Sequence, residues 1–131
     1  MTRSASTFLM FEGRAEEAMT LYASAFPDAT ITSLERFGAN DQGTEGKVKR
    51  GSMTLAGHAL TFFDSSVHHQ FSFTPAISIF VECESEEELE RTYAALLEGG
   101  QALMPLDNYW FSKRFGWVND RFGVSWQLNL Q

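Results

Sequence analysis

Near the C-terminal end of the sequence, apolar and polar residues alternate strictly. The apolar positions are Phe122, Val124, Trp126 and Leu128, and the positions between them are Gly123, Ser125, Gln127 and Asn129. Successive side chains of an extended chain point to opposite sides, so the alternation predicts a strand over residues 122–130 with two different faces. Residues 119–121 favour a turn, which predicts a β-hairpin between this strand and another at 113–118. The polar face indicates a surface open to water or to a ligand.

The first half of the chain predicts one strand, one helix and three further strands. A short apolar run predicts a strand at 7–11, and apolar residues at three- and four-residue spacing predict a helix that ends near Phe26, before Pro27. The next strands are expected at 29–37, 47–56 and 59–64, the last two joined by a hairpin turn at Gly57-His58. Residues 38–46 are polar and rich in glycine. They predict a mobile loop, whose composition would allow it to close over a bound molecule.

The second half predicts the same order of elements. A strand is expected at 76–83, a helix at 85–98, and strands at 101–106, 113–118 and 122–130. Ser85 and Glu88 have the spacing of a capping box at the start of this helix, and Gly99-Gly100 is typical of its end.

An internal repeat is visible when residues 71 positions apart are compared. The matching pairs are Glu16-Glu17 with Glu87-Glu88, Tyr22-Ala23 with Tyr93-Ala94, and Phe26 with Leu97. The repeat predicts two βαβββ modules, at about 5–65 and 76–131, within a single domain spanning residues 1–131. The expected fold class is α+β, with the modules forming a curved, partly open mixed sheet around a cavity and the helices outside.

Composition and charge limit the classes of protein to which this chain can belong. A hydrophobic content of 44% and twelve Phe residues are typical of a folded chain, and a formal net charge of −7 argues against nucleic acid and anionic membranes as partners. No segment has the apolar length of a secretory signal or a membrane span, so we expect a cytoplasmic protein. Cys83 is the only cysteine, and its apolar neighbours predict a buried, reduced thiol.

The doubled βαβββ pattern, opening with FLMFEGRAEEAMTLYASAFP and closing with FGWVNDRFGVSWQLN, resembles the vicinal-oxygen-chelate superfamily. This superfamily contains glyoxalase I, the bleomycin-resistance proteins and the extradiol dioxygenases. The sequence is most similar to its PhnB-like group, often labelled as a 3-demethylubiquinone-9 3-methyltransferase domain. The resemblance implies a homodimer, because cavities in this superfamily are commonly built between modules of two chains.

The resemblance also implies where a metal would bind. Metal-dependent members hold the ion with His and Glu side chains on four strands, and the matching positions here are Thr7, Ala59 or Thr61, Ala76 or Ser78, and Gln127. None of these residues is a His or a carboxylate, so we expect no metal and no other cofactor. A metal ion held by Asp64, His68 and His69 stays an alternative. The other interpretation is that these two histidines and His58 lie on the surface or face a partner.

The methyltransferase label implies S-adenosylmethionine. The usual binding design is a doubly wound parallel sheet with a glycine-rich turn between a strand and a helix. No such turn follows a predicted strand, so we expect no binding of this cofactor by that design.

Three functions agree with these features. The first is a metal-independent binder of a small, flat or apolar molecule, with no assigned catalytic residue. The second is a metal-dependent or metal-free enzyme, such as a lyase, isomerase, dioxygenase or the labelled methyltransferase. The third is an interaction module with a vestigial cavity. For the binder, the expected ligand-binding residues are Thr7, Phe11, Phe63, Ser78, Trp110, Trp117, Ser125 and Gln127. Asp120 is interpreted as a turn residue and not as a base.

Overall fold

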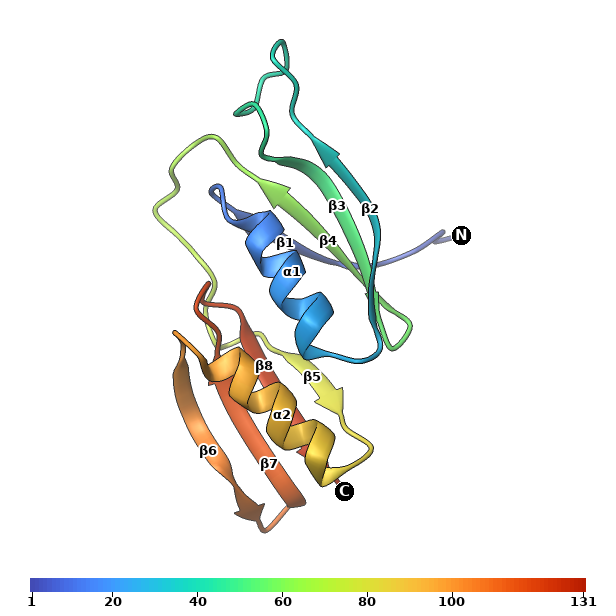
Figure 1. The fold of residues 1–131 in the computed structure, drawn as a ribbon, viewed down its shortest axis with the longest axis vertical. Coiled ribbons are helices and arrows are strands. Elements are labelled where there is room, and N and C mark those ends of the chain that lie inside the picture. The colour runs from blue at the N-terminus through green and yellow to red at the C-terminus, as the bar shows by residue number, and fades with distance from the viewer. The chain divides into compact units, whose positions relative to one another are not determined.

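The computed structural model describes residues 1–131, and the chain divides into two compact units, Met1–His69 and Gln70–Gln131 (Figure 1). Each unit has one helix and one open four-stranded sheet, with the elements in the order strand, helix, strand, strand, strand. The α+β class and the internal repeat are therefore confirmed, with a separate sheet in each unit.

The sheet of the first unit has the strand order β1-β4-β3-β2, in which β1 runs parallel to β4 and the other neighbours are antiparallel. The elements are β1 (Thr7–Phe11), α1 (Ala15–Ala25), β2 (Ala29–Arg36), β3 (Val48–Leu55) and β4 (His58–Asp64).

The sheet of the second unit has the equivalent order β5-β8-β7-β6, again with one parallel pair, β5 and β8. The elements are β5 (Ile79–Glu82), α2 (Glu86–Leu97), β6 (Gln101–Tyr109), β7 (Ser112–Asn119) and β8 (Ser125–Leu130). No helix of either unit has the length and apolar character needed to cross a membrane.

In the first unit, α1 packs on one face of the sheet and forms the core there (Figure 1). Tyr22 is fully buried, and its ring lies 6.0 Å from that of Phe62. Gly51 allows the helix to approach β3 closely, because a Cβ atom at this position would lie 2.6 Å from Sδ of Met19. The residues of β1 and β4 alternate between this core and the opposite face of the sheet.

The start of α1 is fixed by a residue distant in sequence. The residue before the helix, Arg14, makes no side-chain capping hydrogen bond. Instead, Oδ1 of the buried Asp64 accepts hydrogen bonds from the backbone N–H of Gly13 at 2.8 Å and of Ala15 at 3.0 Å, and Oδ2 accepts one from Val48 at 2.9 Å. A carboxylate here is favourable because the helix dipole places partial positive charge at the N-terminus. Asp64 thus joins β4 to α1 and β3.

The second helix starts and ends as predicted. Oγ of Ser85 accepts a hydrogen bond from the backbone N–H of Glu88 at 3.1 Å, and the Glu88 carboxylate accepts one from the N–H of Glu84 at 2.8 Å. Gly99 has a φ of 75° just after the helix, a value that favours glycine.

The predicted strand at 122–130 is wrong in its first three residues, since β8 begins only at Ser125. The buried carboxylate of Asp120 accepts hydrogen bonds from the backbone N–H of Phe122 at 2.9 Å, the N–H of Val124 at 3.0 Å and Nε1 of Trp126 at 3.0 Å. These bonds draw residues 122–124 into the turn. The interpretation of Asp120 as a turn residue is confirmed.

Three other predicted boundaries differ. The β3–β4 turn is formed by Ala56 and Gly57, which have φ values of 49° and 86°, so His58 begins β4 and is not a turn residue. Strand β5 is shorter than predicted and β6 is longer.

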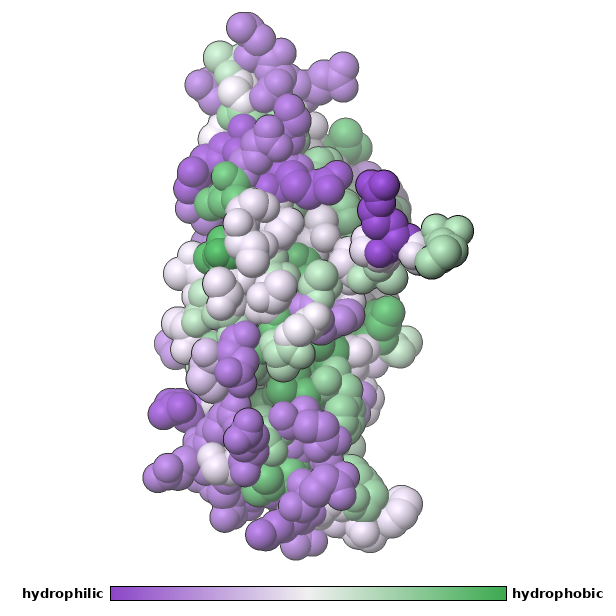
Figure 2. Space-filling view, turned by 90° about the vertical axis from the view of Figure 1, so that its right-hand side faces the viewer, coloured by the Kyte–Doolittle hydropathy of each residue, from purple (hydrophilic) through white to green (hydrophobic).

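The predicted loop at 38–46 is confirmed as a loop, and hydrophilic residues dominate the corresponding end of the first unit at the top of Figure 2. Two backbone hydrogen bonds close its base, from Phe37 to the carbonyl of Lys47 at 2.8 Å and from Gly46 to the carbonyl of Phe37 at 2.9 Å. Its closing over a ligand stays a prediction.

Candidate functional site

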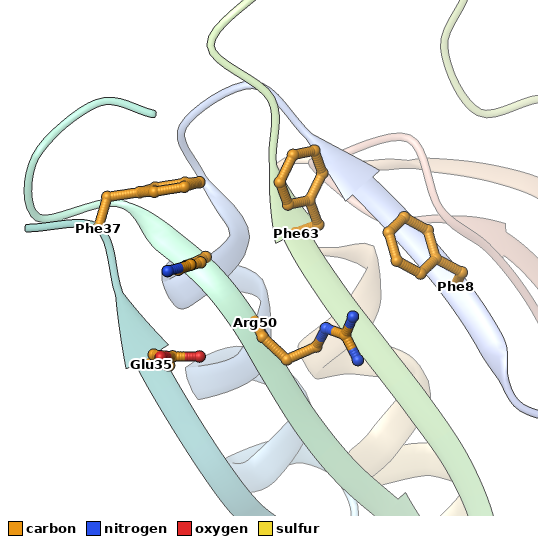
Figure 3. A pocket seen from close by; sticks show the side chains of 6 residues that line it. Phe8, Glu35, Phe37, Arg50 and Phe63 are labelled. Atoms are coloured by element: carbon orange, nitrogen blue, oxygen red, sulfur yellow. The ribbon is translucent and has the colours of Figure 1, made fainter. Parts of the chain in front are cut away.

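A pocket of about 560 Å³ lies on the face of the first sheet that points away from α1 (Figure 3). Strand alternation places its walls there: Leu9 in β1 and Phe62 in β4 are buried on the helix side, so their neighbours Phe8 and Phe63 point the other way. The lining residues all belong to the first unit and are Phe8, Glu35, Phe37, Lys49, Arg50 and Phe63.

Three phenylalanine rings form the apolar wall of this pocket. The ring of Phe63 lies 6.1 Å from that of Phe8 and 6.3 Å from that of Phe37, measured between centroids. Phe37 is fixed against the loop, since a Cβ atom on Gly43 would lie only 2.4 Å from its ring. Phe8 is 55% exposed, so a large apolar surface is open to water. An exposed row of rings offers a flat molecule a surface on which to stack.

Charged residues from β2 and β3 form the other side of the pocket. A bulge between Glu35 and Arg36 leaves Lys49 as an extra residue in β3, which brings Lys49 and Arg50 to the same pocket although they are consecutive. Glu35 and Arg50 are opposite each other in the register, but they form no ion pair. The guanidinium of Arg50 extends away from Glu35, toward the side where Phe8 lies (Figure 3).

The second sheet carries a polar cluster on its face away from α2. Oγ of Ser78 lies 2.7 Å from Oγ of Ser125, and Nε1 of Trp117 donates to Oγ of Ser125 at 2.8 Å. Nε2 of Gln127 donates to Oγ of Ser78 at 3.3 Å. The structure thus brings together four of the predicted ligand-binding residues, because β5 and β7 are both neighbours of β8.

A second group of polar side chains extends along the same face. Nδ2 of Asn129 donates to both carboxylate oxygens of Glu82, at 3.2 and 3.0 Å, and Oγ of Ser112 donates to Oδ1 of Asn129. Glu82 and Ser112 were not predicted from the sequence. Asn129 does lie on the expected polar face of the strand predicted at 122–130.

Thr7 and Phe11 do not reach the first-unit pocket, although they were predicted together with Phe63. Both residues lie on the α1 side of β1, in phase with Leu9. Phe11 is 5% exposed and its ring stacks on that of Phe62 at 5.9 Å, while Oγ1 of Thr7 lies 2.8 Å from Nε2 of His58. The apolar run at 7–11 does not alternate, so the sequence did not show which residues of β1 share a face with Phe63, and a ligand-binding role for Thr7 and Phe11 stays a prediction.

Trp110 lies at the tip of the β6–β7 hairpin and is 96% exposed. Its ring contacts that of Phe111 at a centroid distance of 5.4 Å. It therefore stands apart from the polar cluster of the second sheet.

The pocket residues that the sequence analysis missed are Phe8, Glu35, Phe37, Lys49 and Arg50. Phe8 and Arg50 have a recognisable signal, since each precedes a buried strand residue, Leu9 and Gly51, whose side faces the helix. The bulge that adds Lys49 has no such signal.

The groups of the alternative metal site do not converge. Asp64 is occupied by three backbone N–H groups, Nδ1 of His68 lies 3.0 Å from Oε1 of Glu12, and Nε2 of His69 lies 3.0 Å from Oγ of Ser65. The hydrogen bond with His68 lowers the pKa of Glu12. Within neither unit do three or more His, Cys, Asp or Glu side chains gather as ligands.

Cys83 is buried, as predicted. Burial, together with the nearby carboxylates of Glu88 and Glu82, raises the pKa of the thiol to about 12. The thiol therefore stays protonated near neutral pH and is a poor nucleophile.

Comparison with known proteins agrees with this fold. The family model of 3-demethylubiquinone-9 3-methyltransferase matches residues 3–129. Protein YjdN of Escherichia coli strain K12 is 22% identical over 138 residues, which cover 95% of this chain and 93% of YjdN.

Solved structures of similar proteins have the same fold. The PhnB protein of Bacillus cereus, described as a putative 3-demethylubiquinone-9 3-methyltransferase, is 50% identical with a TM-score of 0.93, over 98% of this chain and all 100% of that one. Protein PA1353 of Pseudomonas aeruginosa is 27% identical with a TM-score of 0.85, over 99% and 98% of the two chains. The fosfomycin resistance protein FosX of Listeria monocytogenes shares the fold at 13% identity, with a TM-score of 0.64 and coverage of 100% and 94%. The chain therefore belongs to the PhnB-like 3-demethylubiquinone-9 3-methyltransferase family.

Proposed function

We propose that this protein binds a small, flat, largely apolar molecule without a metal ion. The observation that carries the proposal is the pocket of about 560 Å³ walled by Phe8, Phe37 and Phe63. This volume is typical of small-molecule sites, and a ligand that covers Phe8 would remove exposed aromatic surface from water.

The polar cluster of Ser78, Trp117, Ser125 and Gln127 is the second part of the proposal. Its hydroxyl, amide and indole groups form hydrogen bonds with one another at distances of 2.7 to 3.3 Å. Groups of this kind can exchange such bonds for bonds to a polar molecule, so we propose the cluster as a separate binding site within the second unit. We further propose a homodimeric, cytoplasmic protein, as expected from the sequence.

Methyl transfer is the alternative that the family description implies. The residues do not fit the usual S-adenosylmethionine design, which uses a parallel sheet and free N–H groups at a helix start. Each sheet here has a single parallel pair, at its edge. The turn from β1 into α1 has one glycine, Gly13, and its N–H, like that of Ala15, is already bound by Asp64.

The proposal is tested with 2-naphthamide, an uncharged flat probe, by titration calorimetry and thermal shift. We expect saturable binding that is unchanged by EDTA. The variants Phe8→Ala and Phe63→Ala should each bind about tenfold more weakly, because truncating a ring in contact with the ligand costs about 1.4 kcal/mol.

Phe71→Ala is the matched control, because Phe71 is 65% exposed and lies outside the pocket lining. Circular dichroism shows whether Phe63→Ala folds, and Phe8, at an exposed position, supplies a variant with little risk to the fold. Binding lost in EDTA would overturn metal independence. Equal affinity of the wild type and both pocket variants would overturn the assignment of the pocket.

A further inference from the structure

We infer that the pocket of the first unit selects a flat apolar molecule carrying one carboxylate, and that Arg50 binds this carboxylate. The inference rests on the proposed function and names the chemical class of the ligand.

The guanidinium of Arg50 has no ion-pair partner, unlike three other cations of its unit. Arg36 pairs with Glu16 at 2.6 Å, Arg14 pairs with Glu17 at 3.1 Å, and Lys49 pairs with Asp41 at 3.7 Å. Arg50 lines the pocket and makes no ion pair, although Glu35 stands opposite it in the register. An unpaired cation beside apolar rings is available to an anionic ligand.

The position of Arg50 matches its proposed role. In Figure 3 its guanidinium points along the sheet toward the side of Phe8, below the ring of Phe63. A ring stacked on Phe8 and Phe63 could therefore present a substituent to the guanidinium. Arginine offers two parallel N–H groups that match the two oxygens of a carboxylate. The surrounding rings exclude part of the water and strengthen the ion pair.

The remaining charges favour a single negative charge on the ligand. Lys49 is engaged by Asp41, so one uncompensated cation faces the pocket, and the Glu35 carboxylate lines the same pocket. Glu35 would repel a phosphate dianion more strongly than a carboxylate. A monocarboxylate is therefore the better fit.

The test compares 2-naphthoate with 2-naphthamide, which share one ring system and differ in charge. We expect the wild type to bind 2-naphthoate about tenfold more tightly than 2-naphthamide, with the preference falling as salt rises. Arg50→Gln should bind both probes alike and keep the wild-type affinity for 2-naphthamide. Arg50→Lys should keep part of the preference, because an ammonium retains the charge and loses the paired geometry.

Arg36→Gln is the matched control, since Arg36 pairs with Glu16 and does not line the pocket. It should keep the full preference. Equal binding of the two probes by the wild type, or a preference that survives in Arg50→Gln, would overturn the carboxylate inference and leave the proposed function standing.

Binding of neither probe would overturn both proposals. If, in addition, Phe8→Ala changed the mass of the protein in solution, the pocket would be a contact between copies of the chain and not a ligand site.

Discussion

Cys83 shows how a single residue combines burial with nearby negative charge. Its thiol has its pKa raised to about 12, first by burial and then by Glu88 and Glu82. Since the thiolate is the reactive form, we expect iodoacetamide at pH 8.5 to modify the folded protein at least about a hundredfold more slowly than the chain in guanidinium chloride. Mass spectrometry of quenched samples measures both rates. Similar rates would contradict the burial and the pKa shift.

The same shift sets a dependence of stability on pH. The folded chain keeps the thiol proton up to about pH 12, whereas the unfolded chain releases it near the ordinary cysteine pKa of 9.0. The unfolded state therefore binds fewer protons between these values, so the free energy of unfolding decreases as the pH rises through this range.

Residue roles that depend on strand alternation could be predicted from the sequence. Ser125 and Gln127 lie on the polar face as expected, and Ser78 and Trp117 join them through the neighbouring strands. The role of Asp64 could not be predicted in this way, because its partners lie up to 51 positions away in the sequence.

At the scale of elements, the two helices begin by different means. Ser85 caps α2 with its own hydroxyl, while α1 depends on the carboxylate of Asp64 in β4. We expect Asp64→Ala to lower the free energy of unfolding by about 3 kcal/mol, because three N–H groups lose their acceptor, and Ser85→Ala to lower it by about 1 kcal/mol.

Urea denaturation followed by circular dichroism measures both changes. Asp28→Ala is the control, since the Asp28 side chain is exposed and has no partner in the structure. An Asp64→Ala variant as stable as this control would show that the carboxylate does not hold α1 and β3.

Most elements could be predicted from hydrophobic periodicity, and the errors lie where side chains override it. The prediction began β8 too early because Asp120 binds the N–H groups of Phe122 and Val124. It also missed that Lys49 and Arg50 share a pocket, because the bulge between Glu35 and Arg36 depends on the pairing of two strands. Local patterns identify elements, whereas pairing between elements determines which side chains meet.

At the scale of the whole molecule, the resemblance to the superfamily implies a homodimer. We expect light scattering coupled to size-exclusion chromatography to give twice the chain mass of 14.7 kDa. Dilution to low micromolar concentration should leave this mass unchanged, because superfamily members commonly share their cavities between chains. A mass equal to one chain would contradict the dimer.

The different starts of the two helices also bear on the order of folding. The cap of α2 spans three residues and can form within a short peptide, whereas the Asp64 bond to Ala15 closes a segment of 49 residues. Closing a longer segment costs more chain entropy, and contacts between distant residues slow folding. We therefore expect α2 to form early on its own sequence, while α1 waits for its sheet. The ribosome synthesises the second unit after the first. Even so, its helix α2 would be able to form before α1.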